Sequence, residues 1–344
     1  MDNHGVLYRA PLPEEWKLGG ETGITQGEVQ DWTPYLPYGE YQGNQYFDTL
    51  ACTHFASGHI YETFIIYLWK TDKLSQEAKD FFTKFLKDEN DINSFRVSKQ
   101  FSAIVGGNTK QGNYFTVAWD TWRKIGAIPE SMLNTLPTAK TWEEYHDKNL
   151  ITQEMLDVAK ESLKYVDVLY QWLSFDSLDG FSDFERSQVL QALKTSPINA
   201  GIPIPANHSV EMYSLEETTF GMLNTYTPFL SHTNANVAFS LQAVVKPRIE
   251  APSPSQHVFT VNLQKGSKGT EVFELQKILV AEGFLNKNLL VQNPNDAYFG
   301  TNTFNGVVKL QEKYATEILK PVGLSHGTGF VGSSTRKFIN NKYK

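Results

Sequence analysis

The sequence predicts an α+β protein in two parts, and three observations carry that prediction. Stretches with a helical spacing of apolar residues come first, at 52–70, 75–87 and 152–171. Short alternating or apolar runs follow after about residue 196 and are typical of strands. Helices followed by strands favour an α+β fold over a wound parallel sheet. The third observation is the stretch 246–257, rich in proline and serine, after which helical patterns return.

The helical stretches carry local start signals as well as periodicity. The stretch 75–87 begins with Ser75 and the stretch 152–171 with Thr152, each followed two residues later by a glutamate. A hydroxyl side chain at this place satisfies an otherwise unpaired N–H of the first turn. In 52–70 the apolar positions at near-helical spacing are Phe55, Ile60, Phe64, Ile65 and Leu68. Trp119 and Trp122 stand three apart on a further predicted helix, and we expect both in the core.

The strand-like runs and the turns around them divide the chain further. The runs HSVEMYSLE, TFGMLNTY and NVAFSLQAVV begin at residues 208, 219 and 236. We expect an N-terminal arm at 1–29, an α+β domain at 30–245, an extended linker at 246–257 and a small domain at 258–344. In the last, three helices begin after glycine turns, which predicts an all-α three-helix bundle.

Composition and charge exclude several classes of function. The formal net charge is −7, so no general attraction to nucleic acid is expected. The longest apolar run, FIIYLW at 64–69, is far shorter than the roughly 18 residues of a membrane span. The first 20 residues show no basic-then-apolar signal pattern. We therefore expect no membrane insertion and no classical secretion.

Metal and cofactor chemistry is not indicated. The chain has one cysteine, which excludes an internal disulfide, and its eight histidines show no HExxH spacing. His54 and His59 are poorly spaced for a shared helix face, which disfavours a metal site. We interpret both as helix-surface or packing residues. Glu62 on the same stretch is interpreted as a structural ion-pair partner. We expect no cofactor.

The single cysteine, Cys52, stands where a loop becomes a helix. Unpaired N–H groups and the positive dipole end of a helix favour a thiolate there, although a lone cysteine is also commonly a small buried apolar residue. A nucleophile needs a base, an orienting group and oxyanion donors. His208 opens one strand-like run and Asn224 ends the next, so adjacent antiparallel strands bring the two together. Gln45 and Gln42, upstream, each offer a side-chain N–H.

These residues, in this order, resemble the papain family of cysteine peptidases over about residues 30–245. The resemblance implies a helical half and an antiparallel β half, with Cys52 as nucleophile, His208 as base, Asn224 as its orienting group and Gln45 as oxyanion donor. Gln45 is preferred to Gln42 because the family's spacing to the cysteine is nearer seven than ten residues. The block GNTKQGNYFTVAWDTWRKIGAIPE resembles the segment that lines the family's substrate cleft. It implies substrate binding at Gln111, Gly112 and Asn113. The texture is similar to divergent phage and bacterial members.

The sequence departs from the family at several positions. The tryptophan expected after the nucleophile is Thr53, and the usual structural cysteines are absent. The tripeptide after Asn224 is TYT where the family has SWG, and Tyr226 is the aromatic candidate to cover the Asn–His bond. Asp48 and Thr49 are expected to shape the loop before Cys52.

Residues 263–341 resemble the three-helix peptidoglycan-binding module. The pattern rests on Gly266, Gly269, Leu275 and Gln276 and on a second set around Gly300, Thr303 and Gln311. These positions are mainly structural: the glycines make turns and the apolar residues make a core. Binding to peptidoglycan is what the resemblance implies, since a fold alone does not fix a function.

Together the two resemblances predict a cysteine peptidase that acts on peptide or amide bonds at the bacterial cell wall. The small domain would hold it there and raise the effective substrate concentration. The missing signal pattern fits a bacteriophage endolysin or a virion-borne enzyme better than a secreted autolysin. Two alternatives stay open: an inactive papain-like virion protein that binds the host surface, and a viral maturation protease. Expected partners are peptidoglycan or wall-associated peptides, and other virion proteins.

Overall fold

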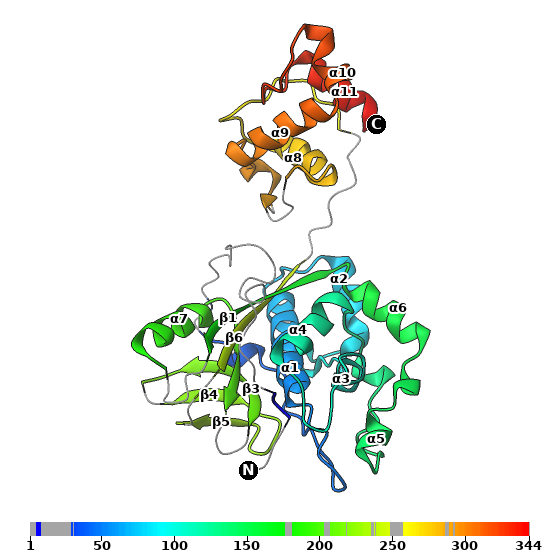
Figure 1. The fold of residues 1–344 in the computed structure, drawn as a ribbon, viewed down its shortest axis with the longest axis vertical. Coiled ribbons are helices and arrows are strands. Elements are labelled where there is room, and N and C mark those ends of the chain that lie inside the picture. Colours follow the sequence, from blue (N-terminus) through cyan, green and yellow to red (C-terminus); the bar gives the residue numbers. More distant parts are fainter. Residues whose placement is uncertain are drawn as a thin grey trace. The chain divides into compact units, whose positions relative to one another are not determined.

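The protein forms two compact units, Met1–Arg248 and Ile249–Lys344 (Figure 1). The structure, a computed structural model, describes residues 5–7, 29, 31–175, 181–202, 207–217, 219–234, 237, 239–247, 257–285, 289–291 and 293–343. The division between the units falls inside the predicted linker 246–257. Residues 246 and 247 of that stretch belong to a strand, and residues 248–256 lie outside the described part.

The first unit combines helices with one antiparallel sheet, which is the predicted α+β class. Its helices are α1 (Cys52–Lys70), α2 (Gln76–Phe82), α3 (Lys99–Val105), α4 (Phe115–Lys124), α5 (Trp142–Tyr145), α6 (Gln153–Ser162) and α7 (Asp183–Leu193). Short 3-10 turns occur at η2 (Thr33–Tyr35), η3 (Thr83–Phe85), η4 (Ile92–Ser94), η5 (Glu130–Met132) and η6 (Lys148–Leu150). No described helix combines the length and the hydropathy of a membrane span.

The six strands of the sheet lie in the order β1-β6-β2-β3-β4-β5, each antiparallel to its neighbours. They are β1 (Val166–Phe175), β2 (Ile198–Ile202), β3 (His208–Leu215), β4 (Phe220–Leu223), β5 (Leu230–Thr233) and β6 (Phe239–Pro247). The prediction of one helix over 152–171 is wrong in its second half. Helix α6 ends at Ser162 and β1 begins at Val166, because alternate residues of β1 (Val166, Val168 and Tyr170) are buried with period two.

Helix α1 is the centre of this unit. Sixteen of its 19 residues are buried, as expected of a helix with protein on every side. It packs against β3 and β6 and against α3 and α4. In Figure 1 the sheet lies on one side of α1, and α3, α5 and α6 lie on the other. Trp119 and Trp122 of α4 are fully buried beside it, which confirms their prediction as core residues. The start of α1, at Cys52, is therefore buried inside the unit.

The second unit has its own apolar core, formed by residues such as Leu275, Phe299 and Val307. Its helices are α8 (Thr270–Ala281), α9 (Thr301–Lys313), α10 (Ala315–Ile318) and α11 (Ser333–Lys342), with 3-10 turns η8 (Pro294–Asp296) and η9 (Lys320–Val322). Each of the three longer helices begins directly after a glycine: Gly269, Gly300 and Gly332.

Candidate active site

Cys52 is the first residue of α1, and its side chain is completely buried. The chain enters the helix through Leu50, whose φ of 55° lies in the left-handed region, and through Ala51. The backbone N–H of Leu50 donates to Asp48 Oδ1 at 2.8 Å, which offsets the cost of this conformation. The turn thus presents the thiol at the buried start of the helix.

His208 and Asn224 come together as predicted from adjacent strands. His208 is the first residue of β3, and Asn224 directly follows β4. His208 Nε2 lies 2.7 Å from Asn224 Oδ1. Because a carboxamide oxygen only accepts, this contact places the ring proton on Nε2 and makes Nδ1 the basic nitrogen. The backbone N–H of Asn224 donates to the carbonyl of Phe229 at 2.7 Å and fixes the start of the turn.

Cys52 lies against the start of β3, the strand that His208 opens. The backbone of Ser209, the residue after His208, hydrogen-bonds the Cys52 thiol, and α1 packs directly on β3. The ring of Tyr226 lies 5.2 Å from the His208 ring, centroid to centroid. Tyr226 is therefore placed to shield the Asn224–His208 hydrogen bond from water. The structure thus brings the buried His208 onto the partly buried Asn224, and it places the buried Cys52 against the residue that follows His208.

The electrostatic surroundings of Cys52 favour the neutral thiol. Burial raises the pKa of Cys52 most, and the negative charge of Asp48 raises it further. The backbone groups of Ser209, Thr53 and Cys52 itself lower it. The helix N-terminus thus acts in the predicted direction, but burial outweighs it in this conformation. A thiolate at Cys52 therefore needs a compensating positive charge nearby.

The structure places the two candidate glutamines differently, and it places the preferred one, Gln45, away from the site. The backbone N–H of Asn44 donates to Phe47 O at 3.0 Å, and Gly43 pairs with Asp48 across the turn. This tight turn carries Gln45 at its exposed tip. Gln42 lies at its base and is fully buried.

Gln42 is attached to the strand end that carries Asn224. Its backbone N–H donates to Thr225 O at 3.2 Å, and its Oε1 accepts from Thr225 Oγ1 at 2.7 Å. The turn folds residues 44–47 out of the path between Gln42 and Cys52, so linear spacing does not decide between the two glutamines.

The predicted substrate-binding residues are contacted by the protein's own N-terminal residues 5–7. Leu7 N donates to Asn113 O at 2.8 Å, and Asn113 N donates to Gly5 O at 2.9 Å. Gly112 has φ of 95°, and a Cβ there would lie 1.9 Å from Gly5 O. Gln111 is exposed. The backbone of this segment therefore does pair with an extended chain, here residues 5–7.

The same N-terminal residues reach the loop before Cys52. A Cβ on Gly5 would lie 1.9 Å from Leu50 O, so the two backbones touch. Val6 is buried in the apolar cluster that also contains Cys52 and Phe115. Residues 5–7 thus lie between Leu50 and Asn113 and contribute to the complete burial of the thiol.

His54 contacts the segment that contains Gly112 and Asn113. This role was not predicted from the sequence. Its Nδ1 lies 2.8 Å from Ser102 Oγ, and its Nε2 lies 3.2 Å from Asn113 Nδ2. Burial lowers the pKa of His54 to about 3, so the ring is neutral. Since neutral imidazole carries one acceptor nitrogen, Nε2 accepts from Asn113 while Nδ1 donates to Ser102. His54 is a positioning residue for the segment, consistent with its interpretation as a packing residue.

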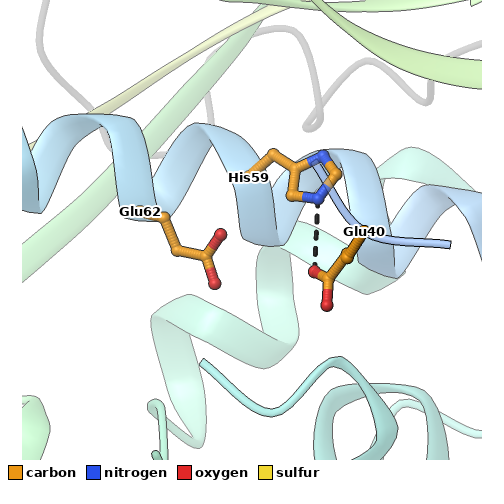
Figure 2. Close-up of side chains that lie close together, drawn as sticks. All are labelled: Glu40, His59 and Glu62. Atoms are coloured by element: carbon orange, nitrogen blue, oxygen red, sulfur yellow. Dashed lines mark hydrogen bonds and ion pairs between the residues drawn. The ribbon is translucent and has the colours of Figure 1, made fainter. Parts of the chain in front are cut away.

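A second group of ionisable side chains lies on α1 away from Cys52. Figure 2 shows His59 and Glu62 projecting from α1 toward Glu40, with His59 Nε2 3.2 Å from Glu40 Oε1. These three residues are the one cluster of potential metal ligands among the described residues. Lys99 Nζ pairs with both carboxylates, and Arg96 lies 3.6 Å from Glu62. The cluster is a buried ion-pair network whose cationic centre is Lys99, and Glu62 has the predicted ion-pair role.

Comparisons with known proteins give little support for a family. No protein-family model and no curated protein matches the sequence. Among solved structures, xylellain, a cysteine protease from Xylella fastidiosa, is similar with a TM-score of 0.42 and 14% identity over 71% of this chain and 96% of that one. A periplasmic domain of the EpsAB fusion protein of the Vibrio vulnificus type II secretion system follows, with a TM-score of 0.20 and 11% identity over 56% and 72%. Neither likeness carries an argument, so the function rests on the geometry.

Proposed function

We propose that the first unit is a cysteine peptidase of the papain type. The observation that carries the proposal is the 2.7 Å contact of His208 with Asn224, which fixes the histidine tautomer, beside a buried Cys52 that the Ser209 backbone contacts. A thiol at a helix start, an imidazole beside it and a carboxamide behind the imidazole are the parts that thiol-dependent acyl transfer needs.

The reaction follows from these positions. His208 Nδ1 takes the thiol proton, and the Cys52 thiolate attacks the substrate carbonyl carbon. The oxyanion of the tetrahedral intermediate is held by the Cys52 backbone N–H and by the Gln42 side chain. The intermediate collapses as protonated His208 gives its proton to the leaving amine. Water, deprotonated by His208, then hydrolyses the thioester and restores the thiol. Asn224 holds the ring in place through both half-reactions.

One observation favours a second candidate function, an inactive papain-like scaffold. Cys52 is completely buried, and its surroundings raise the pKa of the thiol. An inert core cysteine has these properties too. In the peptidase proposal, residues 5–7 must leave the cleft before substrate enters. The two candidates therefore differ in whether Cys52 becomes reactive once exposed.

The C-terminal unit extends the proposal to the site of action. We propose that it anchors the enzyme to the bacterial cell wall, and that the protein is phage-associated. The support is the resemblance of residues 263–341 to peptidoglycan-binding modules, together with a core that is independent of the first unit. Anchoring would raise the local concentration of wall peptide substrate.

The proposed function is tested by incubating the full-length protein with purified sacculi and, separately, with unfolded casein. The measurement is the appearance of new α-amino groups, for wild type and for Cys52→Ser. Release by wild type alone supports a peptidase, and release from sacculi alone supports wall peptides as the substrate. Sacculus binding without release by either protein, at any ratio of enzyme to wall, would contradict the peptidase and leave the scaffold.

A further inference from the structure

The side chain of Gln42 is held at both ends of its amide. Thr225 Oγ1 donates to Gln42 Oε1 at 2.7 Å, and Gln42 Nε2 donates to Asp48 Oδ1 at 2.9 Å. Gln42 and Thr225 are both fully buried, and their backbones are joined by the 3.2 Å hydrogen bond from Gln42 N to Thr225 O. This buried amide therefore has one defined rotamer.

The chemistry of the two partners fixes which way the amide faces. An ionised carboxylate only accepts hydrogen bonds, so the Asp48 side of the amide must be its NH2 group. The carbonyl oxygen then faces Thr225, whose hydroxyl acts as donor. A glutamine held by two groups that can each donate and accept would lack this direction. We call the two contacts of the Gln42 amide, with Thr225 and with Asp48, the Gln42 clamp. Asp48 fixes which side of the amide carries the NH2 group, and Thr225 holds the opposite, carbonyl side.

The amide nitrogen of Gln42 faces Asp48, a carboxylate whose charge acts on the Cys52 thiol. Asp48 precedes Cys52 by four residues, holds the N–H of Leu50 with the same oxygen at 2.8 Å, and its charge acts on the thiol. The other carboxylate oxygen accepts from the Tyr226 hydroxyl, and the Tyr226 ring lies against His208. One carboxylate thus connects the oxyanion glutamine, the nucleophile loop and the cover of the histidine.

We infer that Thr225 and Asp48 are positioning residues that hold the Gln42 amide with its N–H groups toward the oxyanion formed at Cys52. The inference rests on the proposed function. It predicts that removing either partner weakens oxyanion stabilisation without removing the nucleophile. In this assignment the Thr225 hydroxyl and the Asp48 carboxylate act on the oxyanion through Gln42, and the charge of Asp48 acts separately on the thiol.

Two small reagents separate this role from all others. Acetylation of a thiolate by p-nitrophenyl acetate passes through a tetrahedral oxyanion, whereas alkylation by iodoacetamide displaces iodide and forms none. Both reagents are neutral and react with the same sole thiol. The ratio of the two second-order rate constants therefore cancels the accessibility of Cys52 and most of any change in its pKa. Reaction at other groups is subtracted by using protein already blocked at Cys52.

We expect Gln42→Ala to lower this ratio roughly 100-fold, the scale of losing one oxyanion donor. Thr225→Val, which keeps the shape of the side chain and loses its hydroxyl, and Asp48→Asn should each lower it roughly tenfold. Thr225→Ser should restore it. In a Gln42→Ala background, Thr225→Val should have no further effect, because the group it positions is gone.

The matched control is Thr121→Val in α4. Thr121 is also buried, but its hydroxyl donates within its own helix, to Val117 O at 2.9 Å. Its substitution should leave the ratio at the wild-type value. If Gln42→Ala lowers the ratio while folded Thr225→Val and Asp48→Asn do not, the positioning inference is wrong and the peptidase stands. If wild type reacts with both reagents no faster than its His208→Ala variant, the proposed function fails and takes the inference with it.

Discussion

Buried glutamines in the two units make different kinds of contact. In the second unit Gln276 donates to Tyr298 O at 3.0 Å and to Thr303 Oγ1 at 2.9 Å, and Gln311 donates to Phe330 O at 2.8 Å and to Thr335 Oγ1 at 3.1 Å. Gln276 tethers α8 to the start of α9, and Gln311 tethers α9 to the start of α11. Gln42 instead bridges segments 183 positions apart and donates to Asp48 in the loop before Cys52.

This difference shows which side-chain contacts can be predicted from a sequence pattern. The two tethers of the second unit repeat within a few dozen residues, so Gln276, Gln311 and their threonines recur in a visible pattern. The Gln42 clamp exists only after the sheet has brought Thr225 back to the loop before α1. No periodic pattern in the sequence predicts a contact between residues 183 positions apart.

The comparison is tested first by the variant with the largest expected effect. Gln42→Ala should slow acetylation of Cys52 by p-nitrophenyl acetate roughly 100-fold, because it removes an oxyanion donor. Fluorescence-detected unfolding of the first unit should change far less, and all seven tryptophans lie in that unit. An unchanged acetylation rate in a folded variant would show that Gln42 is not the oxyanion donor.

Gln311→Ala should show the opposite pattern. Besides its two donated bonds, Gln311 Oε1 accepts from Thr328 N at 2.8 Å and Gly329 N at 3.0 Å. Truncation leaves the part-buried N–H of Thr328 and the buried N–H of Gly329 without their partner, so the free energy of unfolding of the second unit should fall by about 2–4 kcal/mol. Calorimetry would measure it, with acetylation of Cys52 unchanged. A loss of acetylation would show that the two glutamines are not separate in function.

The buried Glu211 of β3 should give the first unit a measurable pH dependence. Burial, and then the charge of Glu62, raise the pKa of Glu211 to about 8, against an unfolded value of about 4.5. The unfolded chain loses this proton first, so stability falls as pH rises from about 5 to 8, by up to about 1.4 kcal/mol per pH unit.

Glu211→Gln should remove this decline and should stabilise the first unit at pH 8 relative to wild type. Tryptophan fluorescence during urea unfolding, at several pH values, would measure it. Equal slopes in variant and wild type would show that Glu211 is ionised in the folded protein.

The N-terminal residues supply a smaller prediction. Val6→Asp puts a charge among buried apolar side chains and should drive residues 5–7 out of the cleft. Alkylation of Cys52 by iodoacetamide should then be roughly tenfold faster at pH 7, an opening free energy of about 1.4 kcal/mol. Gln111→Asp, an exposed substitution on the neighbouring turn, is the control. No acceleration would mean that other groups bury the thiol.

Gln45→Ala should have the smallest effect of all. The exposed tip of the turn contacts neither Cys52 nor the clamp, so acetylation and alkylation should both match wild type. A loss comparable to that of Gln42→Ala would reverse the assignment of the oxyanion donor.

Much of the framework was predictable from the sequence. Helix α1 at 52–70, the pairing of His208 with Asn224 and the buried tryptophans follow from periodicity and strand order. Linear spacing favours Gln45 over Gln42. It cannot reveal that a turn folds residues 44–47 out of the path from Gln42 to Cys52. The contact of residues 5–7 with Gly112 and Asn113 could not be predicted, since a short arm without periodicity has no local signal for its partner. The helix start at Thr152 predicts a helix, and the apolar residues of β1 read as its continuation to residue 171. The change from helical to alternating burial after Ser162 gives no clear signal in the sequence.

The central claim is that Cys52 and His208 act as one ionised pair, and the pH dependence of Cys52 alkylation by iodoacetamide tests it most directly. The protein has one thiol, so the signal belongs to Cys52 alone. Wild type and His208→Ala keep the same N-terminal residues, so accessibility cancels in the comparison. The account predicts a wild-type apparent pKa well below the ordinary cysteine value of about 8.5, and a loss of that low-pH reaction in His208→Ala. Apparent values at or above about 8.5 in both proteins would contradict it and leave Cys52 as a buried core thiol.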